Sequence, residues 1–341
     1  MANIREVAKK AGVSVATVSR VLNHPQSVSP ITTERVLSVI KELQFTPNGL
    51  ARSLALSRTN TIALLVPNIL NPLYPQIAKG VEDVTHQKGY NILLCNTEYS
   101  EARENQYIDM LLEKRVDGFI LTASQLPPSE FKKIKEAKVP LVLIDRDENP
   151  PENIVYTDYL LGGQLATQHL IEIGYKRIAH ITGPLHLREN KDKCIGYIKA
   201  LEENQLSTHE NLIINGDNEV EGGYIAAKKL LSLHNPPDAI FAANDLMAIG
   251  AIDAIKTEGL KIPNDIAIVG FDDIRMASLV EPKLTTVSQP VYKMGLIAAR
   301  ILFDSIENED DINYQQKIYI QPKLMVRKSC GHENRLREIF N

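Results

Sequence analysis

From residue 61 onward, short continuous apolar runs alternate with stretches whose apolar positions recur every three or four residues. Uninterrupted runs predict strands buried on both faces, which occur in parallel sheets covered by helices. The predicted strands are 62–66, 92–95, 118–121, 141–144, 154–156, 178–182, 212–214, 239–242, 266–271 and 285–288. The predicted helices between them are 77–88, 104–113, 163–173, 193–203, 224–233 and 247–258.

These strands are too many for one compact doubly wound sheet. We therefore expect an α/β body of two subdomains with a cleft between two parallel sheets. Ligands of such folds bind beyond the carboxyl ends of the strands.

The first 46 residues have a different, purely helical pattern. Ile4, Val7, Ala8 and Ala11 form one apolar stripe, and Gly12 follows it where a helix can end in a left-handed residue. Ser14 then supplies an N-cap for a second helix, and Val36, Leu37, Ile40 and Leu43 predict a third. The pattern predicts a three-helix head that contains a helix-turn-helix.

The second helix has a polar outer face suited to nucleic acid. Val18, Val21 and Leu22 are expected to face inward, which leaves hydroxyl groups and a guanidinium outside, on Ser14, Thr17, Ser19 and Arg20. Such groups bind phosphates and base edges. The alternative is an ordinary surface helix pair.

The charge distribution favours a nucleic-acid-binding helix over an ordinary surface helix pair. Residues 1–60 hold eight basic and three acidic side chains, a net charge of +5, whereas the remainder holds 30 basic and 39 acidic ones, a net charge of −9. A positive head on a negative body is typical of a DNA-binding module joined to a larger domain that does not touch DNA.

Length and composition limit the remaining classes of protein to which the chain could belong. A chain of 341 residues with 44% hydrophobic content suggests two or three globular domains. No apolar run is long enough to span a bilayer and no secretory h-region is present, so we expect a cytoplasmic protein. Three widely spaced cysteines indicate reduced thiols rather than a disulfide framework or a metal site.

Polar residues follow several of the predicted strands. Carboxylate, amide and guanidinium groups that converge beside an aromatic ring suit a small polyhydroxylated ligand. The alternative is loop chemistry, because Asn and Asp often cap helices and form turns. The candidates after these strands are Asn68, Asn71, Tyr74, Asp145, Arg146, Asn244, Asp245, Asp272, Asp273 and Gln289.

Motifs of enzymes are missing from the sequence. There is no Gly-x-Gly-x-x-Gly after a strand, no Walker-type loop, no nucleophile elbow and no zinc-protease helix. The Gly162-Gly163 and Gly222-Gly223 pairs are interpreted as tight turns rather than phosphate loops. We expect neither an enzyme nor a bound cofactor or metal.

Several motifs resemble the lactose-repressor/galactose-repressor family. The segment 7–23 resembles its helix-turn-helix signature, and 47–54 resembles its hinge. Body motifs such as Asn71-Pro72, Asn244-Asp245 and Gly270-Phe271-Asp272-Asp273 resemble its effector domain, which is similar to periplasmic sugar-binding proteins. The resemblance covers essentially the whole chain in order, and ribose operon repressors are the most similar branch.

The resemblance assigns DNA-binding roles in the head and hinge. It implies base reading by Val15, Ala16 and Arg20, backbone contacts by Ser14, Thr17 and Asn23, and a minor-groove wedge at Leu54. The hinge also contains Asn48 and Ala51, with Gly49 in place of the usual Ala. Spacing alone favours a plain linker for 48–56, and the resemblance favours a hinge helix that forms on DNA.

The resemblance also implies an effector site, with three departures from the family pattern. Leu73 stands where a second aromatic ring is usual, and Asn218 where another ring can stack. Lys193 replaces an Arg, and therefore offers a point charge instead of a bidentate fork. The implied effector residues are Asn71, Leu73, Tyr74, Asp145, Arg146, Lys193, Asn218, Asn244, Asp272 and Gln289.

The sequence thus predicts a sequence-specific DNA-binding regulator, expected to repress a carbohydrate-utilisation operon as a homodimer on an inverted-repeat operator. Ribose or a related sugar is the expected effector. Control by a sugar phosphate or a phosphoprotein, as in the catabolite-control branch, and a sugar-binding protein without a regulatory role remain alternatives. The expected domains are 1–46 (helix-turn-helix), 47–60 (hinge and linker) and 61–341 (effector binding and dimerisation). The last is expected to comprise two subdomains, 61–160 plus 291–322 and 161–290 plus 323–341.

Overall fold

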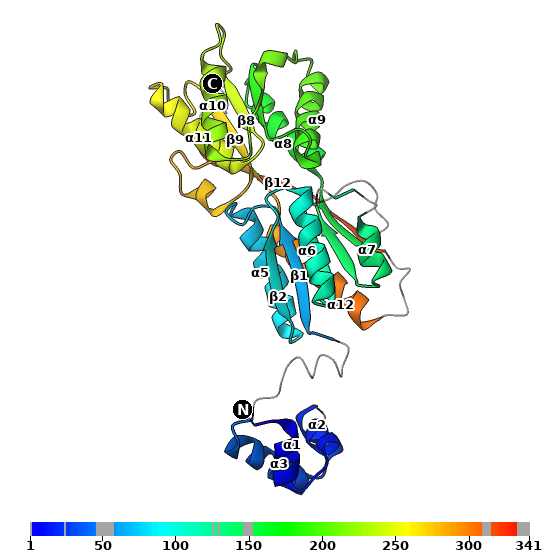
Figure 1. Ribbon diagram of the computed structural model, residues 1–341. Helices are drawn as coiled ribbons and strands as arrows, with labels where there is room; N and C mark the ends of the chain where they lie inside the picture. The colour runs from blue at the N-terminus through cyan, green and yellow to red at the C-terminus, as the bar shows by residue number, and fades with distance from the viewer. Residues whose placement is uncertain are drawn as a thin grey trace. The chain divides into compact units, whose positions relative to one another are not determined.

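The computed structural model describes residues 2–23, 25–45, 58–124, 126–127, 130–145, 153–308 and 315–332. The chain divides after Asn60 into two compact units, 1–60 and 61–341 (Figure 1).

The first unit is a three-helix bundle. Its helices are α1 (Ile4–Ala11), α2 (Val15–Asn23) and α3 (Pro30–Glu42), with a short 3-10 turn η1 (Pro25–Ser27) between the last two. Val7, Val18 and Val36 are fully buried at its centre. Leu37 was predicted to face this core, but it is 49% exposed because Val36 and Val39 occupy the inner face of α3.

The second unit contains two six-stranded sheets. The first has the order β11-β5-β4-β3-β1-β2, and the second β12-β10-β9-β8-β6-β7. All strand pairs are parallel except β10 with β12. The first-sheet strands are β1 (Thr61–Val66), β2 (Asn91–Asn96), β3 (Gly118–Thr122), β4 (Leu141–Ile144), β5 (Asn153–Thr157) and β11 (Lys317–Ile320); those of the second are β6 (Ile178–Thr182), β7 (Ile213–Asn215), β8 (Ala239–Ala242), β9 (Ala267–Asp272), β10 (Thr285–Ser288) and β12 (Lys323–Met325).

Helices cover both faces of each sheet. On the first, α5 (Leu73–Gln87) and α12 (Val291–Glu307) pack against one face, and α6 (Glu101–Glu113) and α7 (Phe131–Glu136) against the other. On the second, α10 (Val220–Leu231) and α11 (Asp245–Thr257) oppose α8 (Tyr159–Glu172) and α9 (Arg188–Glu203). Neighbouring strand residues such as Leu64 and Leu65 therefore enter different cores, which explains the uninterrupted apolar runs. The remaining 3-10 turns are η2 (Glu210–Leu212) and η3 (Arg275–Ser278).

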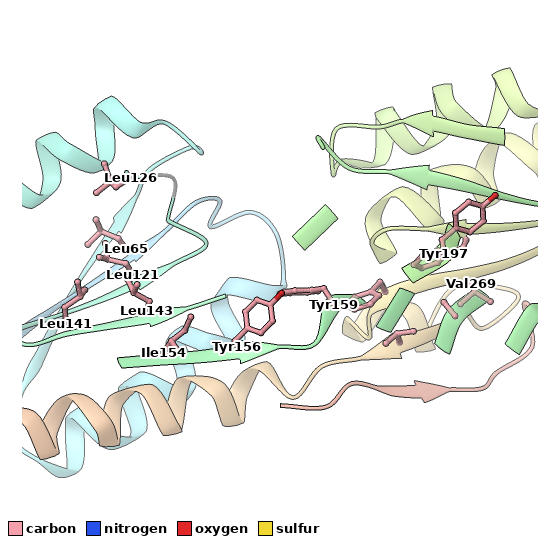
Figure 2. Close-up of a cluster of buried hydrophobic side chains, with 14 of the residues drawn as sticks. Leu65, Leu121, Leu126, Leu141, Leu143, Ile154, Tyr156, Tyr159, Tyr197 and Val269 are labelled. Carbon is pink, nitrogen blue, oxygen red and sulfur yellow. The ribbon is translucent and has the colours of Figure 1, made fainter. Parts of the chain in front are cut away.

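The chain crosses between the two sheets three times, after β5, β10 and β11. Tyr156 and Tyr159 lie on either side of the first crossing, with their rings edge to face at 5.7 Å. They join buried side chains of both sheets into one hydrophobic cluster (Figure 2). The carboxyl ends of strands from both sheets meet at the junction of the two subdomains.

Candidate DNA-binding and effector sites

The head begins with well-capped helices. Asn3 accepts hydrogen bonds from the backbone N–H groups of Arg5 and Glu6 while Glu6 accepts one from the Asn3 N–H, which is a capping box. Gly12 ends α1 in the left-handed conformation, with φ of 66°. These local signals fix the tight turn that leads into α2.

The outer face of α2 carries the residues predicted to bind DNA. Ser14, Val15, Ala16 and Arg20 are exposed, whereas Thr17 and Ser19 are half-buried. The Ser14 and Thr17 hydroxyls lie 2.9 Å apart, and the Thr17 N–H donates to Ser14 Oγ at 3.1 Å. The Asn23 side chain and residues Asn48, Ala51 and Leu54 lie outside the described residues.

A cavity lies at the junction of the two sheets. Strand order reverses between β1 and β3 in one sheet and between β6 and β8 in the other, and ligands of open α/β sheets bind at such switch points. Loops after these strands supply part of the cavity wall. The structure brings together nine of the ten predicted effector residues: Asn71, Leu73, Tyr74, Asp145, Lys193, Asn218, Asn244, Asp272 and Gln289. The tenth, Arg146, lies outside the described residues.

Two aspartates face the cavity from opposite sheets. Asp145 follows β4 and Asp272 ends β9, and both have positive φ, 53° and 106°. The Thr157 N–H donates to Asp145 Oδ1 at 3.1 Å, and Gln289 Nε2 donates to Asp272 Oδ1 at 2.8 Å. Burial raises the pKa of Asp145 to about 7 and that of Asp272 to about 6. Such unfavourable backbone conformations and buried charges are concentrated at functional sites.

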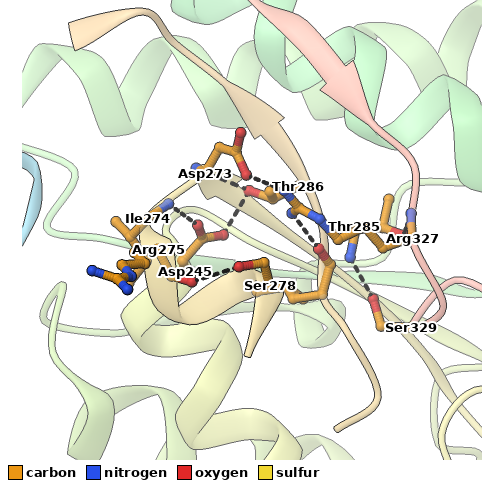
Figure 3. A network of polar contacts seen from close by, with 10 residues as sticks. Asp245, Asp273, Ile274, Arg275, Ser278, Thr285, Thr286, Arg327 and Ser329 are labelled. Carbon is orange, nitrogen blue, oxygen red and sulfur yellow. Dashed lines mark hydrogen bonds and ion pairs between the residues drawn. The ribbon is translucent and has the colours of Figure 1, made fainter. Parts of the chain in front are cut away.

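Asp245 supports the loop that contains Asp272. It is fully buried, accepts a hydrogen bond from Thr286 Oγ1 at 2.6 Å, and accepts another from the Ile274 N–H at 2.9 Å (Figure 3). The same network ties Arg327 to Asp273 at 2.6 Å. Burial raises the pKa of Asp245 well above its ordinary value. Asp245 is therefore a structural neighbour of the cavity rather than part of its lining.

Lys193 is the cation of the cavity among the described residues. Its Nζ donates to the Ala243 carbonyl at 2.9 Å and lies 4.2 Å from the centre of the Phe271 ring and 5.0 Å from that of Tyr159. Gly163 lies against the Lys193 backbone so closely that a Cβ there would approach its carbonyl oxygen to 2.3 Å. The glycine pairs 162–163 and 222–223 lie near the beginnings of α8 and α10, but within the helices rather than in tight turns.

Asparagine residues complete the wall of the cavity. The Leu73 N–H donates to Asn71 Oδ1 at 3.0 Å, and the Met247 N–H donates to Asn244 Oδ1 at 2.8 Å. Asn244 Nδ2 also donates to the Asn218 carbonyl at 2.8 Å. The Asn residues therefore serve as turns and caps and also line the cavity, so the two interpretations of these residues are compatible.

The sequence analysis missed several lining residues. Glu189 and Asn190 lie in the first turn of α9, before the predicted start of that helix at residue 193. Tyr99 follows β2, and its hydroxyl lies 3.3 Å from that of Tyr74. Among the described residues, the lining residues that were not predicted are Tyr99, Thr122, Ala123, Tyr159, Glu189 and Asn190.

The described residues also bear on metal binding and on membrane insertion. No group of three or more His, Cys, Asp or Glu side chains is placed to hold a metal ion within the described parts of the chain. Among these same residues, no helix combines the length and apolar character needed to cross a membrane.

Comparison with known proteins agrees with this architecture. Residues 3–48 match the family described as bacterial regulatory proteins, lacI family, and residues 167–330 match a periplasmic binding protein-like domain. The ribose operon repressor of Halalkalibacterium halodurans is 40% identical over 335 residues, which cover 98% of this chain and 99% of that protein. The chain belongs to the lacI family.

Solved structures of lacI-family proteins resemble both units of the chain. The lac repressor dimer bound to operator and the anti-inducer ONPF has a TM-score of 0.87 at 27% identity, covering 96% of this chain and 99% of that one. A lacI-family regulator from Enterococcus faecium with bound ribose has a TM-score of 0.72 at 29% identity, covering 79% of this chain and 98% of that one. The expected α/β fold class with a helix-turn-helix head is confirmed.

Proposed function

We propose that this lacI-family protein is a DNA-binding repressor of a carbohydrate-utilisation operon, and that a small neutral sugar such as ribose controls its affinity for the operator. The observation that carries the proposal is that nine predicted effector residues from both subdomains meet in one cavity. The similarity to a ribose operon repressor over 98% of the chain supports the choice of sugar.

The chemistry of the cavity suits a polyhydroxylated ring. Asp145 and Asp272 offer acceptors for hydroxyl groups from opposite walls. Lys193, Asn71 and the tyrosine hydroxyls supply donors, while the Tyr74 ring and Leu73 offer apolar surface. Most of the lining side chains carry polar groups, which can pair with ring hydroxyls and fix the orientation of a small ligand.

DNA binding is proposed for the exposed face of α2. Val15, Ala16 and Arg20 are exposed there, and the first 60 residues carry a net charge of +5. In a helix-turn-helix, the N-terminal part of the second helix contacts base edges in the major groove. The hinge roles of Asn48, Ala51 and Leu54, and the backbone contact of Asn23, remain predictions.

We propose a homodimer, because each protomer offers one recognition helix. Both subdomains leave large apolar side chains exposed, including Leu93 and Leu94 on the edge strand β2 and Ile225 and Leu279 in the second subdomain. Exposed apolar residues on an edge strand favour association. Sugar binding would then change the relative orientation of the subdomains and so the spacing of the two heads. A cytoplasmic location and the absence of enzymatic activity belong to the same proposal.

The test is a gel shift with operator-like inverted-repeat DNA, with and without a panel of pentoses and hexoses. The proposal expects a shifted complex that weakens steeply with salt and whose stability one neutral sugar changes. Sugar binding without any DNA complex would instead support a sugar-binding protein without a regulatory role. Response only to a sugar phosphate or a phosphoprotein would support control of the catabolite type.

A further inference from the structure

Glu189 adds a third carboxylate to the cavity. It lies in the first turn of α9, next to Asn190, and both line the cavity with Lys193 one turn further along. Arg188 and Asp192 form an ion pair at 3.0 Å on the same helix. Nothing in the sequence analysis assigned Glu189 a role.

The charges that line the cavity do not balance. Asp145, Glu189 and Asp272 are acidic, whereas Lys193 is the basic residue among the described ones. Arg146 follows Asp145 in sequence but lies outside the described residues. Even with its charge counted, three carboxylates outnumber two cations. Lys193 is also committed in part, because its Nζ donates to the Ala243 carbonyl.

The charge of Glu189 acts on the whole lining. Burial is the largest cause of the raised pKa of Asp145, Asp272, Tyr74, Tyr99 and Tyr159, and the negative charge of Glu189 raises all five further. These residues come from both subdomains. Any ligand between them therefore also experiences the field of Glu189.

We propose that Glu189 is a specificity determinant that restricts the cavity to effectors without negative charge, excluding sugar phosphates and sugar acids. The inference rests on the proposed function, and it names the charge class of the effector. In a closed cavity a phosphate ester would face three carboxylates at low local dielectric, where like-charge contacts are strongly unfavourable. A neutral sugar can instead donate hydroxyl hydrogens to the same carboxylates.

Calorimetry on the full-length protein at pH 7.5 tests the inference with matched pairs: ribose and ribose 5-phosphate, glucose and glucose 6-phosphate, fructose and fructose 6-phosphate. For the wild-type protein we expect one neutral sugar to bind at least roughly 100-fold more tightly than its phosphate. Glu189→Gln should narrow that ratio by about tenfold or more, because it removes one negative charge without changing the side-chain shape. Glu202→Gln, exposed on the same helix, should leave the ratio unchanged.

The outcomes separate the two proposals. A phosphate that binds the wild-type protein as tightly as its parent sugar overturns the charge selection but leaves a sugar-controlled repressor intact. An unchanged ratio in Glu189→Gln overturns the role of Glu189, and circular dichroism shows whether that variant is folded. If no sugar and no phosphate binds the wild-type protein, the proposed function fails and this inference fails with it.

Discussion

Asn68 and Glu219 join the two subdomains beside residues that line the cavity. Asn68 Nδ2 donates to Glu219 Oε1 at 2.9 Å, although the residues lie 151 positions apart. Asn68 follows β1 in the first subdomain, and Glu219 immediately precedes α10 in the second. Each lies within three residues of a lining residue, Asn71 or Asn218. The hydrogen bond therefore connects the walls that a bound sugar would draw together.

Removing this contact should weaken sugar binding. A hydrogen bond to a charged group contributes roughly 1.5 kcal/mol, so Asn68→Ala is expected to lower sugar affinity about tenfold in calorimetry. Asn68→Asp should lower it more, because two carboxylates would then face each other. Glu221→Gln, which changes a nearby exposed charge, is the control. Wild-type affinity in both Asn68 variants would show that the bond does not support closure.

Replacing Asp272 should stabilise the unliganded protein at neutral pH while abolishing sugar binding. Burial raises the pKa of Asp272 from 3.8 to about 6. A raised pKa in the folded state means that its contribution to stability is complete below pH 3.8 and is lost as pH rises through 6. The difference corresponds to roughly 3 kcal/mol. Asp272→Asn should therefore unfold at higher denaturant concentration than the wild-type protein at pH 8.

In the wild-type protein, sugar affinity should increase as the pH rises, whereas the contribution of Asp272 to stability decreases. The affinity is expected to rise between pH 5 and 8, as Asp272 and Asp145 ionise and become better acceptors for hydroxyl groups. Asp253 is exposed on α11, and Asp253→Asn should change neither the pH dependence of stability nor that of sugar affinity. Equal unfolding free energies of Asp272→Asn and the wild-type protein at pH 8 would contradict this account of the buried charge.

Asp245 should matter for stability rather than for direct ligand contact. Asp245→Ala leaves the Ile274 N–H and the Thr286 hydroxyl buried without their acceptor, at an expected cost of about 3 kcal/mol in the free energy of unfolding. Sugar affinity should fall as well, because the loop at Asp272 and Asp273 loses its support. The control is Asp253→Ala in urea unfolding. A loss below about 0.5 kcal/mol would show that the network contributes little.

Arg20 should contribute much of the DNA affinity and nothing to the stability of the fold. It is exposed on α2, so Arg20→Ala is expected to weaken operator binding by about 1–3 kcal/mol in fluorescence anisotropy. Sugar affinity and the circular dichroism spectrum should not change. Arg300→Ala, which removes an exposed arginine from the body, is the matched control. Equal operator affinities in the two variants would contradict the assignment of α2 as the recognition helix.

Much of the body could be predicted because its strands are buried on both faces. Runs such as 62–66 and 141–144 are apolar throughout, since successive side chains enter different cores. The strand ends then indicated Asp145, Asp272 and Gln289 as neighbours in space. The departures lie at the sheet edges. Leu93 and Leu94 of β2 are exposed, and β11 and β12 are short strands in which exposed residues alternate with half-buried ones.

Helix beginnings were harder to predict than helix interiors. The predicted helix at 193 begins at Arg188 in the structure, and the one at 77 begins at Leu73. The first turn of α9 is polar and lacks the apolar period, so Glu189 and Asn190 gave no helical signal. Tyr159 lies in the first turn of α8, ahead of the predicted start of that helix at residue 163. The helix α12 was also missed as an element.

The central claim is that sugar bound in the body controls DNA binding by the head. The direct measurement is the affinity of the full-length protein for an inverted-repeat duplex selected from genomic fragments at about 50 mM salt, titrated with the sugar that calorimetry identifies. Our account predicts that the sugar changes operator affinity at least tenfold in the wild-type protein and not at all in Asp272→Ala, which still binds the duplex. An operator affinity that the bound sugar leaves unchanged in the wild-type protein would contradict it.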